Sequence, residues 1–191
     1  MPDLVTNAQV LAGWPGLARL DPIEQAALLT AASRAIERYC NRTFAVTAYT
    51  ETHSGRNLPR VWLANRPVVA VTSVTVDGQA LDNTTGDAWT VTPETGELLR
   101  GGGRGDPRFA PWFPWGRNNI VVAYTAGFAT VPADVHLAAR YLVQHMSESR
   151  KGIGPIRSET IGDYAYQLEG GGGWPAAVTD LLRFHVLTAG I

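Results

Sequence analysis

Apolar side chains recur every three or four positions in three stretches of the chain, a spacing typical of one face of a helix. The three stretches predict helices over residues 21–40, 132–150 and 175–188. In the first of them Asp21 is placed to act as the N-cap, because Pro22 suits the first helical position. We therefore expect one long helix before, and two helices after, a region with a different pattern.

Two details refine this helical part. Thr6 can cap a short helix over residues 6–12, which the Gly-Trp-Pro-Gly run at 13–16 would end. The long helix over 21–40 should bury an apolar stripe that contains Leu28, Ala32, Ala35, Ile36 and Tyr39.

Between residues 43 and 125 the pattern changes to short runs of β-branched and aromatic residues, separated by turn-forming residues. The longest run covers residues 67–76 and ends at Asp77-Gly78, a pair typical of tight hairpin turns. Because no helical spacing lies between the runs, they predict a mostly antiparallel sheet or a small sandwich. One more strand is predicted over residues 161–168.

Together these patterns predict an α+β fold in a single domain that spans residues 1–191. A helical bundle would contain the helices, and the β block at about 43–125 would be inserted into it. The parts of this domain are the helical segments 1–42 and 130–191, the β insertion 43–126, and two flexible loops over 101–117 and 169–174.

Charge is sparse along the chain. Charged residues make up 17% of it and the net charge is −1, whereas about 25% is usual in soluble domains. A dedicated nucleic-acid-binding protein usually carries a clear excess of positive charge, so sequence-specific binding of nucleic acid is not expected. Few charges also suggest that other subunits cover much of the surface. The start is unlike a signal peptide and no apolar run approaches a membrane span, which favours folding in the cytoplasm.

No group of residues has the spacing of a familiar catalytic, cofactor or metal site. The glycine-rich run at 101–105 lacks the Gly-Lys-Ser/Thr ending of a phosphate-binding loop. His136 and His145 are nine positions apart, which places them on opposite faces of a helix. Cys40 is the one cysteine, and we expect it to be a buried, inert thiol. We therefore predict no catalytic residues, no cofactor and no metal.

The most unusual segment is the aromatic run that holds Phe109, Trp112, Phe113 and Trp115. One interpretation is that it folds back to cover the sheet. The other is that it inserts into a neighbouring subunit, because aromatic side chains dominate interface hot spots. Stacking on single-stranded nucleic acid is a third option, which the weak basic charge disfavours.

Three segments, taken in order, resemble the head–tail connector (adaptor) proteins of tailed bacteriophages and prophages. Residues 35–44 run from a helix end into a strand, residues 124–135 from a strand into a capped helix, and residues 158–166 form a return strand. The middle segment, Tyr-Thr-Ala-Gly-Phe-Ala-Thr-Val-Pro-Ala-Asp-Val, is the most specific. The resemblance spans residues 21–168.

The resemblance implies a structural role in the virion and no catalysis. Members of this family form a ring, commonly a dodecamer, that docks under the portal protein at the head–tail interface. On the other side lies a tail-side connector, stopper or tail terminator protein, and double-stranded DNA passes through the ring without sequence-specific binding. The chain would be made in the host cytoplasm during assembly, with no membrane partner.

Two alternatives come from other classes: another phage tail-completion or assembly protein, and a small cytoplasmic enzyme whose site is assembled from distant residues. The candidate interface or docking residues are the apolar and aromatic side chains near the loops and the return strand: Phe109, Trp112, Phe113, Trp115, Ile161, Tyr164, Tyr166 and Trp174.

Overall fold

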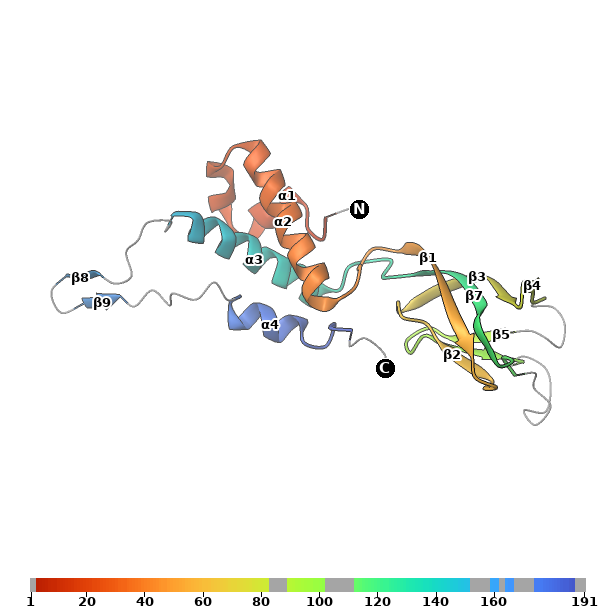
Figure 1. The fold of residues 1–191 in the computed structure, drawn as a ribbon. Helices are drawn as coiled ribbons and strands as arrows, with labels where there is room; N and C mark the ends of the chain where they lie inside the picture. Colours follow the sequence, from red (N-terminus) through yellow and green to blue (C-terminus); the bar gives the residue numbers. More distant parts are fainter. Residues whose placement is uncertain are drawn as a thin grey trace. The chain divides into compact units, whose positions relative to one another are not determined.

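A computed structural model describes residues 3–82, 89–101, 112–151, 159–161, 164–166 and 174–187 (Figure 1). Its helices and antiparallel sheets confirm the predicted α+β class. The chain divides into two compact units. The helical unit contains Met1–Arg42 and Val131–Leu187, and the β unit is centred on Thr43–Thr130.

Among its described residues, the helical unit has five helical elements, and the long ones are α2 and α3. Helix α3 packs against both α2 and α4, while α1 packs against its neighbour η1. Within the described ranges, none of the helices combines the length and the apolar character that a membrane crossing demands. The elements are α1 (Asn7–Gly13), the 3-10 helix η1 (Pro15–Arg19), α2 (Pro22–Cys40), α3 (Ala133–Lys151) and α4 (Ala176–Leu182).

Both predicted helix caps are confirmed. The Thr6 hydroxyl accepts a hydrogen bond from the Gln9 backbone N–H at 3.3 Å, and the Gln9 side chain accepts one from the Thr6 N–H at 2.8 Å. The Asp21 carboxylate accepts a hydrogen bond from the Ile23 N–H at 2.8 Å. These contacts satisfy N–H groups that have no partner inside the helix, so they fix where α1 and α2 begin.

The buried stripe of α2 is rotated from the predicted one. Leu28, Ala32 and Ile36 are buried as expected, but the Tyr39 side chain is 41% exposed and Ser33 is fully buried instead. Burial of Ser33 is possible because its hydroxyl donates to the Leu29 carbonyl at 2.8 Å and accepts from the Leu4 N–H at 3.0 Å. The predicted stripe member Ala35 is only partly buried.

Helix α4 is shorter than the predicted helix over 175–188, because it ends at Leu182. Beyond that point the chain forms a turn, in which the His185 N–H donates to the Leu182 carbonyl at 2.8 Å, and then makes tertiary bonds. The His185 ring lies 2.7 Å from the Asp134 carboxylate, and the Leu187 N–H donates to the Cys40 carbonyl at 2.9 Å. These bonds attach the segment after α4 to the ends of α2 and α3.

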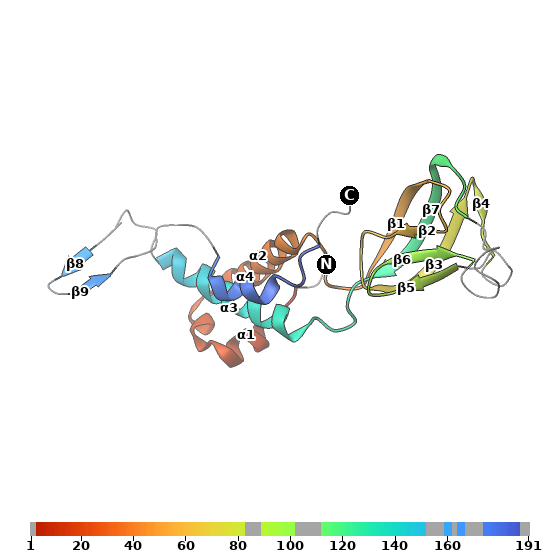
Figure 2. The same cartoon turned by 90° about the horizontal axis from the view of Figure 1, so that it is seen from below.

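The β unit consists of two sheets whose neighbouring strands are all antiparallel, as predicted (Figure 2). A four-stranded sheet has the order β1-β7-β3-β4, and a three-stranded sheet has the order β2-β6-β5. Their strands are β1 (Thr47–Gly55), β2 (Arg60–Trp62), β3 (Val68–Val76), β4 (Gln79–Ala80), β5 (Trp89–Thr92), β6 (Glu97–Arg100) and β7 (Gly116–Ala126).

One apolar core lies in the β unit, and both sheets contribute to it. Side chains alternate across each strand, so Ile120, Val122 and Tyr124 of β7 are buried, while the residues between them are partly exposed. Leu98 from β6 is also fully buried in the same core. The β unit is therefore a small sandwich in which each sheet has one buried face and one outer face.

The strand predicted over residues 161–168 is instead part of a hairpin. Strand β8 (Glu159–Ile161) pairs antiparallel with β9 (Tyr164–Tyr166), and Ile161 lies opposite Tyr164. In the sequence, Gly162 and Asp163 interrupt the run of residues with high β propensity.

Candidate functional site

The aromatic segment at Trp112–Trp115 is fixed to the β unit by Phe113. The Phe113 N–H donates to the Leu58 carbonyl at 2.9 Å, and the Phe113 side chain is fully buried in the core. The Arg100 guanidinium lies 5.9 Å from the centre of the Phe113 ring, and it donates to the Trp112 carbonyl at 2.8 Å. For Phe113, the structure therefore shows a core residue that anchors the segment.

Two tryptophans beside this anchor are turned to the outside. Trp112 is 55% exposed and Trp115 is 77% exposed. The Asn119 side chain holds the backbone between them, because it donates to the Pro114 carbonyl at 3.2 Å and accepts from the Gly55 N–H at 2.8 Å. The exposed tryptophans are thus carried by a backbone with defined hydrogen bonds.

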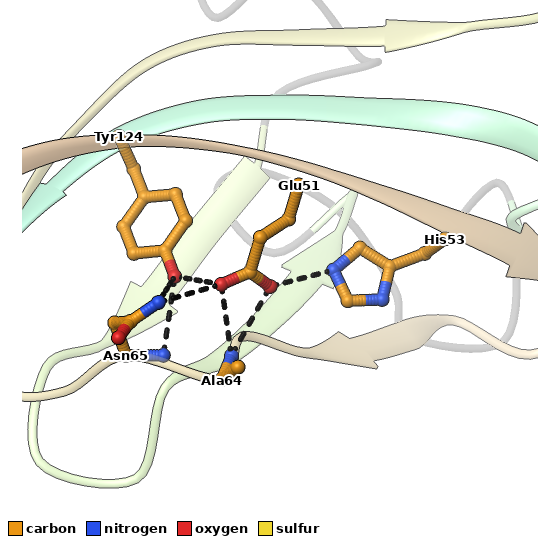
Figure 3. Close-up of polar contacts among 5 residues, drawn as sticks. All are labelled: Glu51, His53, Ala64, Asn65 and Tyr124. Carbon is orange, nitrogen blue, oxygen red and sulfur yellow. Dashed lines mark hydrogen bonds and ion pairs between the residues drawn. The ribbon is translucent and has the colours of Figure 1, made fainter. Parts of the chain in front are cut away.

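A polar cluster inside the β unit centres on Glu51 (Figure 3). Its carboxylate accepts hydrogen bonds from the Ala64 N–H at 3.1 Å, the Asn65 side chain at 3.1 Å and the Tyr124 hydroxyl. The His53 ring nitrogen lies 3.0 Å from Oε2, the oxygen that also accepts the 3.1 Å bond from Ala64, whereas Asn65 and Tyr124 donate to Oε1. These contacts tie the segment after β2 to strands β1 and β7.

Within this cluster, the pKa values of Glu51 and Tyr124 move in opposite directions. Burial alone would raise the pKa of Glu51, but the hydrogen bonds from His53, Tyr124, Ala64 and Asn65 outweigh it and lower the pKa from 4.5 to about 2. Burial and the neighbouring Glu51 raise the pKa of Tyr124 well above its usual range. At neutral pH the Glu51 carboxyl is therefore an anion and the Tyr124 side chain a neutral phenol, so the hydrogen bond between them is charge-assisted.

The β unit should lose stability in acid because of Glu51. Its folded-state pKa is below the unfolded value, so its contribution is fully present at neutral pH and is lost as pH falls from about 4.5 towards 2. Urea unfolding between pH 7 and pH 2 should show this slope, and Glu51→Gln should reduce it and cost about 1–3 kcal/mol at pH 7. Glu94→Gln is the matched control, because Glu94 is exposed in a turn. An unchanged slope in Glu51→Gln would contradict this assignment.

In the helical unit, two side-chain contacts flank the ends of the long helices. The ring centres of Tyr39 and Trp174 are 4.9 Å apart, and Trp174 is partly buried there.

The second contact joins Asp134 and His185. Burial alone would raise the pKa of Asp134, but hydrogen bonds from His185 and from the Val135 N–H outweigh it and lower the pKa. The contact between Asp134 and His185 thus holds the segment after α4 against the start of α3.

Four candidate interface residues remain, three of them in one hairpin. Ile161, Tyr164 and Tyr166 belong to the β8–β9 hairpin, whose backbone is described, and Phe109 lies outside the described residues. Sequence reasoning missed Glu51 and Tyr124. The signal available was the alternation of Tyr49, Glu51 and His53 with small polar residues, which marks one strand face.

No cluster of three or more histidine, cysteine, aspartate or glutamate side chains suited to a metal ion occurs in the part of the chain that the structure describes. The described residues also include exposed apolar side chains and a strand at a sheet edge, features that are suited to binding other proteins.

A family model described as head completion protein matches residues 15–154 of the chain. A search of curated protein sequences with this chain found no match. Among solved structures, a chain in the neck of a native gene transfer agent (GTA) particle, computed with C12 symmetry, matches with a TM-score of 0.54 and 17% identity. That match covers 100% of this chain and 96% of the other. A chain in the neck of an empty GTA particle, computed with C6 symmetry, matches with a TM-score of 0.54 and 17% identity over 87% of this chain and 81% of the other. At these identities the likeness shows a shared fold.

Proposed function

Because the chain belongs to the head completion protein family, we propose that it is a ring-forming subunit of the joint between the head and the tail of a phage-like particle. The family match carries this proposal. It confirms the resemblance drawn from the sequence, and it runs from η1 through the β unit to the end of α3, so both units belong to the family's architecture. The role is structural and needs no catalytic residue.

The ring would sit between the portal on the head side and a stopper or tail terminator on the tail side, in the neck of the virion. Double-stranded DNA would pass through it. The net charge of −1 is compatible with passage, because affinity for DNA rises with each phosphate that a basic side chain neutralises. The fold shared with a chain of a neck with C12 symmetry supports a ring of twelve copies.

Deletion of the gene from the phage that encodes the chain tests this function. Packaged heads and complete tails should both accumulate but fail to join, and expression of the intact chain from a plasmid should restore joined, infectious particles. The control is the same plasmid with a stop codon early in the gene, which should not restore joined particles. Normal yields of infectious particles from the deletion phage would overturn the proposal.

We further propose that Trp112 and Trp115 contact the portal. Both are exposed on a backbone that hydrogen bonds hold in place, and burying a large aromatic side chain at an interface can contribute about 2 kcal/mol or more. Trp112 and Trp115 are only three positions apart in the chain, and exposed apolar side chains that cluster mark a binding surface, whereas a single one such as Trp62 needs no partner.

Replacing both tryptophans by alanine should weaken binding of the chain to the portal by about 100-fold or more, since two hot-spot side chains are lost. The free energy of unfolding should change little, because neither side chain is in the core. The matched control is Trp62→Ala, which removes from strand β2 a side chain whose exposed fraction (53%) is close to that of Trp112. Surface-immobilised portal would report the affinities, and an unchanged affinity of the double variant would contradict the assignment.

A further inference from the structure

Strand β1 has an open edge. Within the described residues it pairs only with β7, along one side, over the whole length from Thr47 to Gly55. In an antiparallel pair, every second residue of an edge strand directs its N–H and C=O away from the partner. Strand β1 therefore presents a row of backbone donors and acceptors that an additional strand would satisfy.

The edge carries few of the features that usually prevent strand addition. It contains no proline and no lysine, and the side chains on its outer face, Ala48, Thr50, Thr52 and Ser54, are small, exposed and uncharged. Glu51 points inward, where its carboxylate is held by the cluster described above. A register shift between His53 and Gly55 limits the accessible stretch to residues 47–53.

The outer faces of the two sheets differ in charge. The face of the β2-β6-β5 sheet carries an ion pair between Arg60 and Glu97, with a nitrogen–oxygen distance of 2.9 Å. The face of the β1-β7-β3 sheet has none in its paired rows, which are Ala48–Thr125–Ala70, Thr50–Ala123–Ser73 and Thr52–Val121–Thr75. The sheet with the open edge thus also has an outer face whose paired rows are uncharged, so a neighbouring protein could cover them without burying a charge.

The β8–β9 hairpin is a candidate for the additional strand at this edge. Its strands have three residues each, and among the described elements they pair only with each other. A two-stranded hairpin of this length is not stable alone in water and gains stability from a third strand or a packed surface. Of the two strands, β9 is better suited to pair with another copy, because its Tyr-Ala-Tyr sequence favours β structure and is uncharged. Strand β8 contains Glu159, a charged residue with low β propensity.

We propose that β9 of one copy adds to the open edge of β1 in a neighbouring copy. The inference deepens the proposed function and rests on it. Each copy would give one strand and accept one, so the contact joins two different surfaces, and repetition of such a head-to-tail contact closes a ring when the rotation is right. Main-chain hydrogen bonds would provide the affinity, as in other complexes formed by strand addition.

Paired cysteines test this contact. The native Cys40 does not interfere, because it is fully buried and burial raises its pKa to about 11, which leaves no reactive thiolate. Thr50→Cys on β1 is combined with Ala165→Cys on β9, and assembled rings are oxidised and separated in denaturing gel without reductant. We expect a ladder of covalent multimers that extends to the full ring. The matched control is Thr90→Cys with Ala165→Cys, because Thr90 is exposed on the outer face of the other sheet, and it should give no ladder.

Other outcomes are distinguishable. A dimer from Thr50→Cys alone would mean that two β1 edges pair with each other, and a monomer with an internal disulfide would mean that β9 adds to its own chain. Either result overturns the proposal. Rings of the expected mass without any ladder, also when Ala48→Cys or Thr52→Cys replaces Thr50→Cys, would overturn the β1–β9 contact while the proposed function stands. Absence of any ring, free or on the portal, would overturn both.

Discussion

Replacing Phe113 by alanine should lower the free energy of unfolding of the β unit by about 3–5 kcal/mol, the usual cost of removing a fully buried phenylalanine. The Phe113 ring has no exposed surface and lies in the core with Val61, Leu98 and Ile120. Alanine would leave a cavity that the surrounding strands cannot close completely. Equilibrium unfolding in urea, followed by circular dichroism, measures the change.

The neighbouring residue provides the control. Trp112→Ala removes a larger side chain that is 55% exposed, so the free energy of unfolding should change by less than about 1 kcal/mol. The pair separates the two interpretations of the aromatic segment, because one residue is expected to act in folding and the other in docking. Equal losses in both variants would contradict this division.

Gly127→Ala should destabilise the β unit by about 3 kcal/mol or more, because strain and overlap add at one position. Gly127 has a φ of +131°, which side chains rarely adopt, and a Cβ there would lie 2.5 Å from the Ala45 carbonyl oxygen. The overlap would push apart the segments on which Phe44 and Phe128 stack, with ring centres 6.1 Å apart. Thermal unfolding followed by calorimetry should show a lower Tm.

Gly78→Ala is the matched control for this prediction. Gly78 also has a positive φ, of +78°, but nothing lies within 4 Å of the position that a Cβ would take. Strain alone should cost about 1–2 kcal/mol. Equal losses in the free energy of unfolding would mean that the close approach of Ala45 to Gly127 adds nothing to the cost of the Gly127→Ala substitution.

Much of the fold follows from local patterns. The caps at Thr6 and Asp21 were predictable because a side-chain oxygen at the right offset satisfies N–H groups that every helix start leaves open. The antiparallel block was predictable because β-branched runs alternated with turn signals over 43–125. These features depend on neighbours within a few residues along the chain.

What the sequence did not predict depends on distant contacts. The rotation of the α2 stripe arises from Leu4, 29 positions before Ser33, which donates to the Ser33 hydroxyl. The early end of α4 arises from the bond of Leu187 to Cys40. The cluster around Glu51 brings together residues up to 73 positions apart. The spacing of apolar and polar residues along the chain does not indicate such distant partners, because it depends only on near neighbours in the sequence.

The aromatic segment shows the same limit at a candidate site. Trp112 and Phe113 are adjacent, and nothing local distinguished the exposed side chain from the buried one. The difference is set by the bridge between Phe113 and Leu58, which belongs to a segment before β2. The sequence could indicate that this region holds a docking surface, but the choice of the residues on it required the tertiary structure.

The mass that this chain adds to the purified portal of the same phage tests the central claim most directly. Twelve copies of a 20.6 kDa chain weigh about 247 kDa, and native mass spectrometry resolves that gain on a portal ring. We expect a single complex heavier by this amount, in which every copy is bound cooperatively. A portal whose mass does not change, in the presence of a chain that stays a folded monomer, would contradict the account.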